Sequence, residues 1–213
     1  MKNINTKYLN EFIDNEVKAD VDSGLELLNS IDSPIVTFLG SHVGVKGDSH
    51  YDIAYEAGKI LGSKGFAVMT GGGPGVMEAG NKGAKEVGAD SIGITAYLIK
   101  GEKVKENNLT HRLDMKYMFV RRFILSIKSQ ALIVFPGGYG TFNELFEFVT
   151  LMQVNMVDRV PIILIDRKFW SGLTNWIQTL VDKKMIEKSD LDLLEFADDV
   201  EELVLRFKEH NLL

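Results

Sequence analysis

The sequence predicts an α/β protein with a Rossmann-like doubly wound parallel sheet and helices on both faces. Short β-rich runs alternate with longer helix-like stretches along most of the chain, and such alternation indicates parallel strands joined by crossover helices. Three of the runs end in glycine-bearing loops, at the position where ligands bind in sheets of this kind. The length of 213 residues and the hydrophobic content of 45% suit one domain, expected to span 1–213.

The expected elements follow in order. A helix from Tyr8 to Asn29 comes first, because apolar side chains recur along it at helical spacing, and we expect this N-terminal segment, 1–30, to cover the domain. Six short runs bounded by turn residues then read as strands: Ile35 to Leu39, Ala67 to Thr70, Ser91 to Thr95, Ala131 to Phe135, Pro161 to Asp166 and Leu194 to Ala197. Helices are expected at Tyr51 to Ser63, Val76 to Val87, Tyr117 to Lys128, Thr141 to Met152, Phe169 to Lys184 and Asp198 to Glu209. The polar stretch from Ile99 to His111 is expected to be a long loop, which in a compact domain often serves a site.

Composition and charge exclude several classes of function. The formal charge of -6 and the pI near 5.3 argue against a sequence-independent nucleic-acid surface, which would concentrate lysine and arginine. Without cysteine the chain has no disulfides, no thiolate metal ligands and no cysteine nucleophile. No apolar run approaches the roughly 20 residues that span a bilayer, and the first residues lack the apolar stretch of a signal peptide. We therefore expect a cytoplasmic protein with neither a membrane nor a nucleic-acid partner.

The most informative motif is Pro136-Gly137-Gly138-Tyr139-Gly140-Thr141-Phe142-Asn143-Glu144, directly after an apolar run. A strand that runs into glycines and then opens a helix leaves several N–H groups unpaired where the helix dipole favours negative charge. We therefore expect this turn to hold a phosphate, with the Glu144 carboxylate close enough to act on the attached group. The alternative is structural, because T-x-x-E is also a capping box in which Thr141 and Glu144 satisfy each other's backbone N–H groups. The three glycines favour the ligand site.

Two other glycine loops are expected at the same edge of the sheet. Gly40-Ser41 follows the first strand, and Gly71-Gly72-Gly73-Pro74-Gly75 follows the second. The second loop fits a tight turn without a ligand equally well. Glu78 and Asn81 fall in the first turns of the next helix, from which both could reach ribose hydroxyls. The alternative for both is complementation of the helix dipole and exposure to solvent.

Arg121 and Arg122 interrupt an otherwise apolar helical segment. A guanidinium is rarely buried without an anionic partner, so one of the two is expected to meet a carboxylate or a ligand. The alternative is a salt bridge to an acidic neighbour or a path along the apolar stem to solvent, and it is stronger for Arg122.

Several familiar site types are missing from the sequence. His42, His50, His111 and His210 show no metal-ligand spacing, so no metal site is expected. The chain has no G-x-G-x-x-G pattern, no P-loop and no G-x-S-x-G. We expect neither a nicotinamide enzyme, a P-loop NTPase nor a serine hydrolase, and no cofactor.

Three segments together resemble the Lonely Guy (LOG) family of phosphoribohydrolases, whose members are often labelled lysine decarboxylases. They are Gly71 to Ala79, Met118 to Arg122 and Pro136 to Glu144, and the resemblance covers roughly Ile35 to Asp166. The P-G-G-x-G-T-x-x-E run is matched without a departure. No lysine stands in a recognisable pyridoxal-phosphate context, so the decarboxylase label has no mechanistic support in the sequence.

The resemblance implies hydrolysis of the N-glycosidic bond of a nucleoside 5'-monophosphate, a cytokinin ribotide or AMP, to free base and ribose 5-phosphate. It implies that Glu144 and Arg121 are catalytic, with the carboxylate stabilising positive charge on the ribose and handling the attacking water. Arg121 either holds the nucleotide in register or carries negative charge on the departing base. The expected substrate-binding residues are Gly40, Ser41, Gly72, Gly73, Glu78, Asn81, Met118, Arg122, Gly137, Gly138, Gly140 and Thr141.

The chain departs from the pattern of similar family members at two positions that bear on base selection. His42 stands where arginine is often seen, and Phe119 stands where histidine is common. The resemblance also implies a homodimer or larger homo-oligomer with active sites near the subunit interface. Two alternatives stay open: a non-catalytic carrier of a phosphorylated ligand such as the molybdenum cofactor, and a capping box with no ligand at all.

Overall fold

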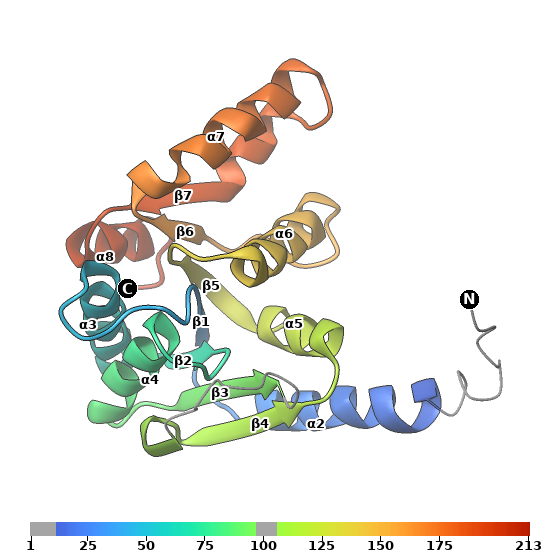
Figure 1. The fold of residues 1–213 in the computed structure, drawn as a ribbon, viewed down its shortest axis with the longest axis vertical. Coiled ribbons are helices and arrows are strands. Elements are labelled where there is room, and N and C mark those ends of the chain that lie inside the picture. The colour runs from blue at the N-terminus through green and yellow to red at the C-terminus, as the bar shows by residue number, and fades with distance from the viewer. Residues whose placement is uncertain (1–11, 97–105) are drawn as a thin grey trace.

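In the described residues, 12–96 and 106–213 of a computed structural model, seven parallel strands form one sheet (Figure 1). The strands are β1 (Ile35–Leu39), β2 (Ala67–Thr70), β3 (Ser91–Ala96), β4 (His111–Met115), β5 (Ser129–Val134), β6 (Ile162–Ile165) and β7 (Leu194–Ala197). Their order in space is β4-β3-β2-β1-β5-β6-β7. The chain builds outward from β1 in one direction and from β5 in the other. The neighbours β1 and β5 therefore flank the switch point at which such sheets bind ligands.

Helices cover both faces of this sheet. The helices α3, α4 and α8 pack on one face, to the left in Figure 1, and α2, α5, α6 and α7 pack on the other. Their bounds are α2 (Lys18–Asn29), α3 (Ser49–Ser63), α4 (Val76–Glu86), α5 (Met118–Ser126), α6 (Tyr139–Gln153), α7 (Arg167–Asp182) and α8 (Val200–Glu209). A π-helical turn, η1 (Phe12–Val17), precedes α2, and short 3-10 segments occur at η2 (Glu106–Asn108) and η3 (Lys188–Leu193).

The central strands β1, β2 and β5 are mostly apolar, and both of their faces are covered. Val36 and Phe38 of β1 pack among residues of α3, α4 and α8, whereas Ile35 packs with residues of α2 and α5. All five residues of β1 are buried. Strands buried on both sides read as continuous hydrophobic runs, which is how they stand in the sequence.

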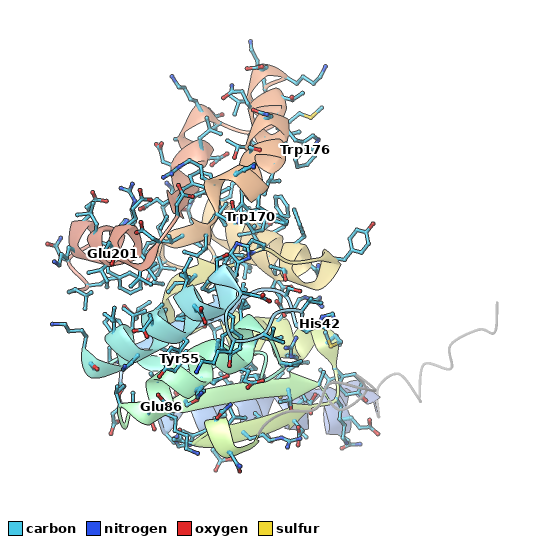
Figure 2. All side chains as sticks on the ribbon, turned by 60° about the vertical axis from the view of Figure 1, so that its left-hand side comes forward. His42, Tyr55, Glu86, Trp170, Trp176 and Glu201 are labelled. Atoms are coloured by element: carbon cyan, nitrogen blue, oxygen red, sulfur yellow. The ribbon has the colours of Figure 1, made fainter. Side chains whose placement is uncertain are left out.

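Helices α3 and α4 pack backbone against backbone. A Cβ on Gly58 would lie 2.3 Å from the carbonyl oxygen of Gly80, and a Cβ on Gly83 would lie 2.1 Å from the carbonyl oxygen of Tyr55. Glycine is the residue that allows this approach. The Tyr55 hydroxyl of α3 also donates to the Glu86 carboxylate of α4, and the two side chains lie side by side in Figure 2. Helix α4 is therefore fixed relative to α3, together with the loop that leads into it from β2.

The predicted fold class is confirmed, and all six predicted strands form within two residues of their expected bounds. The prediction missed β4, an edge strand in which Arg112 and Asp114 are exposed while Met115 is buried. The predicted loop from Ile99 ends where β4 begins, and its residues 99–105 lie outside the described residues. The predicted N-terminal helix is α-helical only from Lys18; its part before Phe12 is also outside them. Among the described residues no helix is long and apolar enough to cross a bilayer.

Candidate ligand site at the switch point

A cavity of about 330 Å³ lies at the carboxyl ends of β1 and β5. It is lined by the loop after β1 and by the first turns of α4, α5 and α6. The predicted site residues that line it are Gly40, Ser41, Met118, Arg121, Arg122, Gly138, Gly140, Thr141 and Glu144. Residues far apart in the sequence thus meet at the switch point, where the sequence predicts a ligand site.

The start of α6 presents unused backbone donors to this cavity. Gly138 is the N-cap residue, and it has no side chain with which to cap the helix. The first helical hydrogen bond runs from the N–H of Phe142 to the carbonyl of Gly138. Helix geometry therefore leaves the amides of Tyr139, Gly140 and Thr141 without partners inside the helix, where the dipole favours an anion. A Cβ on Gly138 or Gly140 would meet no other atom within 4 Å, so no neighbouring group crowds the α-carbons of these two residues.

Hydrogen bonds fasten the loop after β1 to the other two glycine loops. The Ser41 amide donates to the carbonyl of Pro136 at 3.1 Å, and the Ser41 carbonyl accepts from the Val76 amide at 3.4 Å. Gly75, with a φ of 72°, passes so close that a Cβ there would lie 2.5 Å from the Ser41 carbonyl oxygen. Ser41 is thus held between the starts of α4 and α6, and these contacts fix the backbone of the cavity wall that Ser41 forms.

A buried ion pair crosses the cavity wall between α5 and α6. Arg121 Nη1 donates to Glu144 Oε1 at 3.0 Å, with the two side chains 7% and 13% exposed. The same guanidinium donates from Nε to the Ile94 carbonyl at 2.7 Å and from Nη2 to the Gly71 carbonyl at 3.3 Å. The prediction that one arginine meets a carboxylate is confirmed. Desolvation offsets much of the attraction in a buried ion pair. A contribution to stability alone therefore does not explain the presence of the Arg121–Glu144 pair in this wall.

Burial raises the pKa of the Glu144 carboxyl above its ordinary value of 4.5. The charges of Arg121 and Arg122 act in the opposite direction, and the nearby carboxylate of Glu147 adds to the increase. A carboxyl with a perturbed pKa beside a cavity and a specific charged partner is a candidate for proton handling or charge stabilisation.

A second, more exposed ion pair lies next to the first. Arg122 Nε donates to Glu147 Oε2 at 2.5 Å, with side chains 21% and 28% exposed. Arg122 also lines the cavity. The salt bridge anticipated for Arg122 is therefore present, and it leaves the side chain at the cavity surface.

The structure does not form the capping box that was the alternative for Thr141 and Glu144. Helix α6 begins at Tyr139, so Glu144 lies beyond the first turn, and its carboxylate pairs with Arg121 instead. Gly137 has a packing role of its own, because a Cβ there would lie 2.1 Å from Thr141 Oγ1. Gly137 therefore admits the Thr141 side chain but does not itself line the cavity.

The structure corrects the expected position of Asn81. Asn81 is 1% exposed, and its amide group donates to the carbonyls of Val68 and Ile92 and to Ser91 Oγ while accepting from Thr70 Oγ1. This side chain joins α4 to β2 and β3 inside the protein, so it is not available to a ribose. A buried carboxamide needs such partners, and here the sheet supplies them.

Three other predicted binding residues also lie outside the cavity lining. Gly72 and Gly73 are buried in the loop after β2, and a Cβ on Gly72 would lie 2.5 Å from the Thr95 side chain. Glu78 occupies the first turn of α4, as expected for a residue that complements the helix dipole. These positions shape the loop and the helix start rather than the cavity surface.

His42, which bears on base selection, lines the cavity, and three further lining residues were not predicted: Met77, Tyr139 and Asn143. Each of these three stands within Gly71 to Ala79 or Pro136 to Glu144, so its place in the sequence was a usable signal. Tyr139 is 97% exposed and Met77 only 9%. In the described parts of the chain, no group of three or more His, Cys, Asp or Glu side chains is arranged to hold a metal ion.

Known proteins resemble this chain in sequence. A family model described as "Possible lysine decarboxylase" matches residues 77–207. A cytokinin riboside 5'-monophosphate phosphoribohydrolase of Arabidopsis thaliana is 27% identical over 177 residues, 83% of this chain and 82% of the relative. One from Mycobacterium tuberculosis is 26% identical over 153 residues, 71% of this chain and 81% of the relative.

Solved structures share the fold. The molybdenum cofactor binding protein of Rippkaea orientalis superimposes with a TM-score of 0.63 at 21% identity, over 84% of this chain and 98% of that one. The molybdenum cofactor carrier protein of Chlamydomonas reinhardtii gives a TM-score of 0.61 at 23% identity, over 83% and 96%. With the family model spanning more than half of its length, the chain belongs to the "possible lysine decarboxylase" family, the LOG family that its three motifs resemble.

Proposed function

We propose that this protein hydrolyses the N-glycosidic bond of a nucleoside 5'-monophosphate, releasing the free base and ribose 5-phosphate. The single observation that carries the proposal is the placement of the buried Glu144 carboxylate next to the unused amides that begin α6. An anion seat and an acidic group in one cavity suit a substrate that is phosphorylated at one end and reacts at its sugar. Relatives named phosphoribohydrolases support the same assignment.

In the proposed reaction the phosphate binds at the amides of Tyr139, Gly140 and Thr141. This remote contact positions the ribose, so that binding energy is used for orientation. The bond between C1' and the base nitrogen breaks as the water oxygen bonds to C1', and one proton of the water ends on the base. Positive charge develops on the sugar, and the ionised Glu144 stabilises it and orients or deprotonates the water.

The substrates proposed are a cytokinin ribotide or AMP. Cytokinin ribotides are suggested by the names of the relatives, at about a quarter identity. The base would lie toward His42, Met77 and Met118, which line the cavity beside the polar residues. The departures at His42 and Phe119 leave the choice of base to experiment.

A second candidate is a non-catalytic carrier of a phosphorylated ligand such as the molybdenum cofactor. The solved structures of molybdenum cofactor binding and carrier proteins favour it, because they share the fold over more than four fifths of this chain. The buried Arg121–Glu144 pair favours hydrolysis over carriage, since a carrier has no need of a carboxyl with a raised pKa at its ligand.

Glu144→Gln separates the two functions. The wild-type protein is expected to release base from AMP or isopentenyladenine ribotide but much more slowly from adenosine, which lacks the phosphate. The variant is expected to lose at least about 100-fold in kcat while it keeps its affinity for ribose 5-phosphate, because the amide retains the shape but not the charge. The measurement is chromatography of the released base with calorimetric binding of ribose 5-phosphate. No release of base from any nucleoside monophosphate, with ribose 5-phosphate bound equally by the wild type and the variant, would favour the carrier. Release by both proteins at the same rate would contradict the role of Glu144.

We also expect a homo-oligomer, as the resemblance implies. Helix α5 exposes Met118, Phe119 and Phe123 at 43%, 51% and 40%, and Met118 also lines the cavity. Association through this apolar surface would place the cavity near a subunit interface. Light scattering coupled to size-exclusion chromatography is expected to give at least twice the chain mass of 23.8 kDa; a monomer at all concentrations would contradict this.

A further inference from the structure

The two neighbouring arginines of α5 have very different surroundings. All three guanidinium nitrogens of Arg121 have acceptors: the Ile94 carbonyl in β3, the Glu144 carboxylate, and the Gly71 carbonyl after β2. The Arg121 side chain is only 7% exposed. An arginine held in this way by a strand, a loop and one carboxylate has a fixed orientation, and its charge is already paired.

Gly71 is the residue that makes this orientation possible. A Cβ at Gly71 would lie 2.1 Å from Arg121 Nη2 and 3.0 Å from Met77 Sδ. Contacts below 3.0 Å force something to move, so alanine at this position would displace the guanidinium or the loop. The absence of a side chain at Gly71 therefore lets Arg121 reach the sheet and hold the carboxylate.

Arg122, unlike Arg121, has nitrogens that are available to a ligand. Its Nε donates to Glu147, and within the described residues its two terminal nitrogens have no hydrogen-bond partner. Its side chain is 21% exposed and lines the cavity. A guanidinium with two unoccupied nitrogens at the surface of a cavity is suited to a two-point contact with phosphate oxygens.

We propose that Arg121 is a positioning residue that acts through Glu144, and that Arg122 is the arginine that contacts the substrate, at its phosphate. This division rests on the proposed function and refines it. The phosphate is the group of a nucleoside monophosphate that carries full negative charge before the reaction begins. A contact to it is present in the bound substrate as well as in the transition state, so loss of Arg122 weakens binding. Loss of Arg121 disturbs the carboxylate and weakens the chemical step.

The test compares Arg122→Gln with Arg121→Gln. Arg122→Gln is expected to raise KM for AMP and Kd for ribose 5-phosphate by about 10-fold or more, with kcat within about 3-fold of wild type. Arg121→Gln is expected to lower kcat by about 100-fold with Kd for ribose 5-phosphate within about 3-fold. It also removes the positive charge beside Glu144, so the acidic limb of the pH profile is expected to move to higher pH. A purely structural role for Arg121 would not move this limb.

Gly71→Ala covers the case in which Arg121→Gln does not fold. It keeps every charge but displaces the guanidinium, and it is expected to lower kcat by about 10-fold with an unchanged Kd for ribose 5-phosphate. Gly172→Ala on α7 is the matched control, because a Cβ there meets nothing within 4 Å; it is expected to leave both constants unchanged.

Two results would overturn the division: a 10-fold loss of ribose 5-phosphate affinity in Arg121→Gln or Gly71→Ala with an unmoved acidic limb, or unchanged affinity in Arg122→Gln. Failure of the proposed function gives a different result. In that case no base is released by the wild type, while the binding measurements still rank the two arginines.

Discussion

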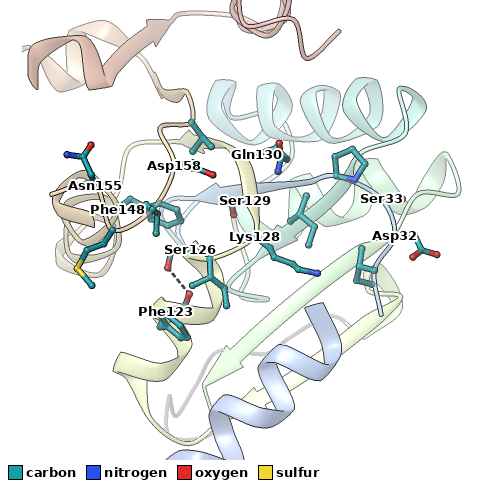
Figure 3. A pocket seen from close by; sticks show the side chains of 17 residues that line it. Asp32, Ser33, Phe123, Ser126, Lys128, Ser129, Gln130, Phe148, Asn155 and Asp158 are labelled. Carbon is teal, nitrogen blue, oxygen red and sulfur yellow. Dashed lines mark hydrogen bonds between the residues drawn. The ribbon is translucent and has the colours of Figure 1, made fainter. Parts of the chain in front are cut away.

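Cavities lie at both the amino and the carboxyl ends of β1 and β5, and the larger of these two is not the better candidate for a ligand site. The cavity at the amino ends of the strands, here the amino-edge cavity, has a volume of about 810 Å³ (Figure 3). It is lined by the starts of β1 and β5, the end of α5 and the segment after α6, including Ser126, Lys128, Ser129 and Asp158. The cavity at the switch point has a volume of about 330 Å³.

The two cavities differ in what their polar groups already contact. In the amino-edge cavity Ser126 Oγ donates to the Phe123 carbonyl, as the dashed line in Figure 3 marks, and Ser129 Oγ donates to the Leu125 carbonyl. Lys128 Nζ donates to the Leu28 carbonyl at the end of α2. At the carboxyl edge, the start of α6 supplies amides that have no partners inside the helix. Strand direction in a βα unit, rather than cavity size, therefore decides where an anion can bind.

Among the tests of the difference between the two cavities, the largest effect is expected from a negative charge placed in the proposed phosphate seat. Gly138→Asp fits sterically, because a Cβ there meets nothing within 4 Å, and aspartate is a favoured N-cap residue. Its carboxylate would occupy the amides of α6, so KM for AMP is expected to rise by about 10-fold or more, about 1.4 kcal/mol, without loss of thermal stability. Steady-state kinetics and a melting curve check this, with Gly172→Asp as the control. Unchanged KM in Gly138→Asp would remove the distinction between the two cavities.

An effect of intermediate size is expected from the dependence of kcat/KM on pH. Burial raises the pKa of Glu144, so this carboxyl takes up its proton at a higher pH than an exposed glutamate. Because the ionised form acts in the proposed reaction, kcat/KM is expected to fall as the pH decreases through this raised pKa. Carbon-13 NMR of the glutamate carboxyls, assigned by comparison with Glu144→Gln, is expected to show a midpoint above 4.5. The exposed Asp158 of the amino-edge cavity supplies the control, because Asp158→Asn should leave the midpoint in place. A midpoint at or below 4.5 contradicts the expectation.

The smallest effect is expected at the amino-edge cavity itself. Lys128→Ala removes the hydrogen bond and the positive charge at the carboxyl end of α2. Stability is expected to fall by about 0.5–1 kcal/mol, as is usual for one such contact. Turnover of AMP and affinity for ribose 5-phosphate are expected to stay within error, as measured by denaturant unfolding and by the same assays. A 10-fold change in either would show that this cavity takes part in function.

The sequence was sufficient for those parts of the fold in which pattern and burial agree. The strands β1 and β2 are short apolar runs covered on both faces, and their predicted bounds match the structure. Strand β4 was missed because His111, Arg112 and Asp114 give an edge strand the composition of a loop. Its membership of the sheet comes from pairing with β3, which is a long-range contact that local composition does not report.

The candidate site was predictable to the extent that it follows from local motifs. The glycines after β5 indicated free amides, and the Arg121 segment indicated a buried charge. Asn81 was misplaced because a carboxamide at a helix start looks the same in sequence whether it faces a ligand or the underlying sheet. The partner of Arg121 was also beyond the sequence, since the contact to Glu144 depends on how α5 and α6 lie next to each other.

The glycine contacts between α3 and α4 limit how this cavity can change. Because Gly58 and Gly83 already bring the two backbones into contact, α4 has no room to shift toward α3. Room must come from side chains instead, and the two methionines that line the cavity, Met77 and Met118, are the flexible groups at hand. Substitution of these two methionines by smaller residues is therefore expected to widen the range of ligands that the cavity accepts, with the helices left in place.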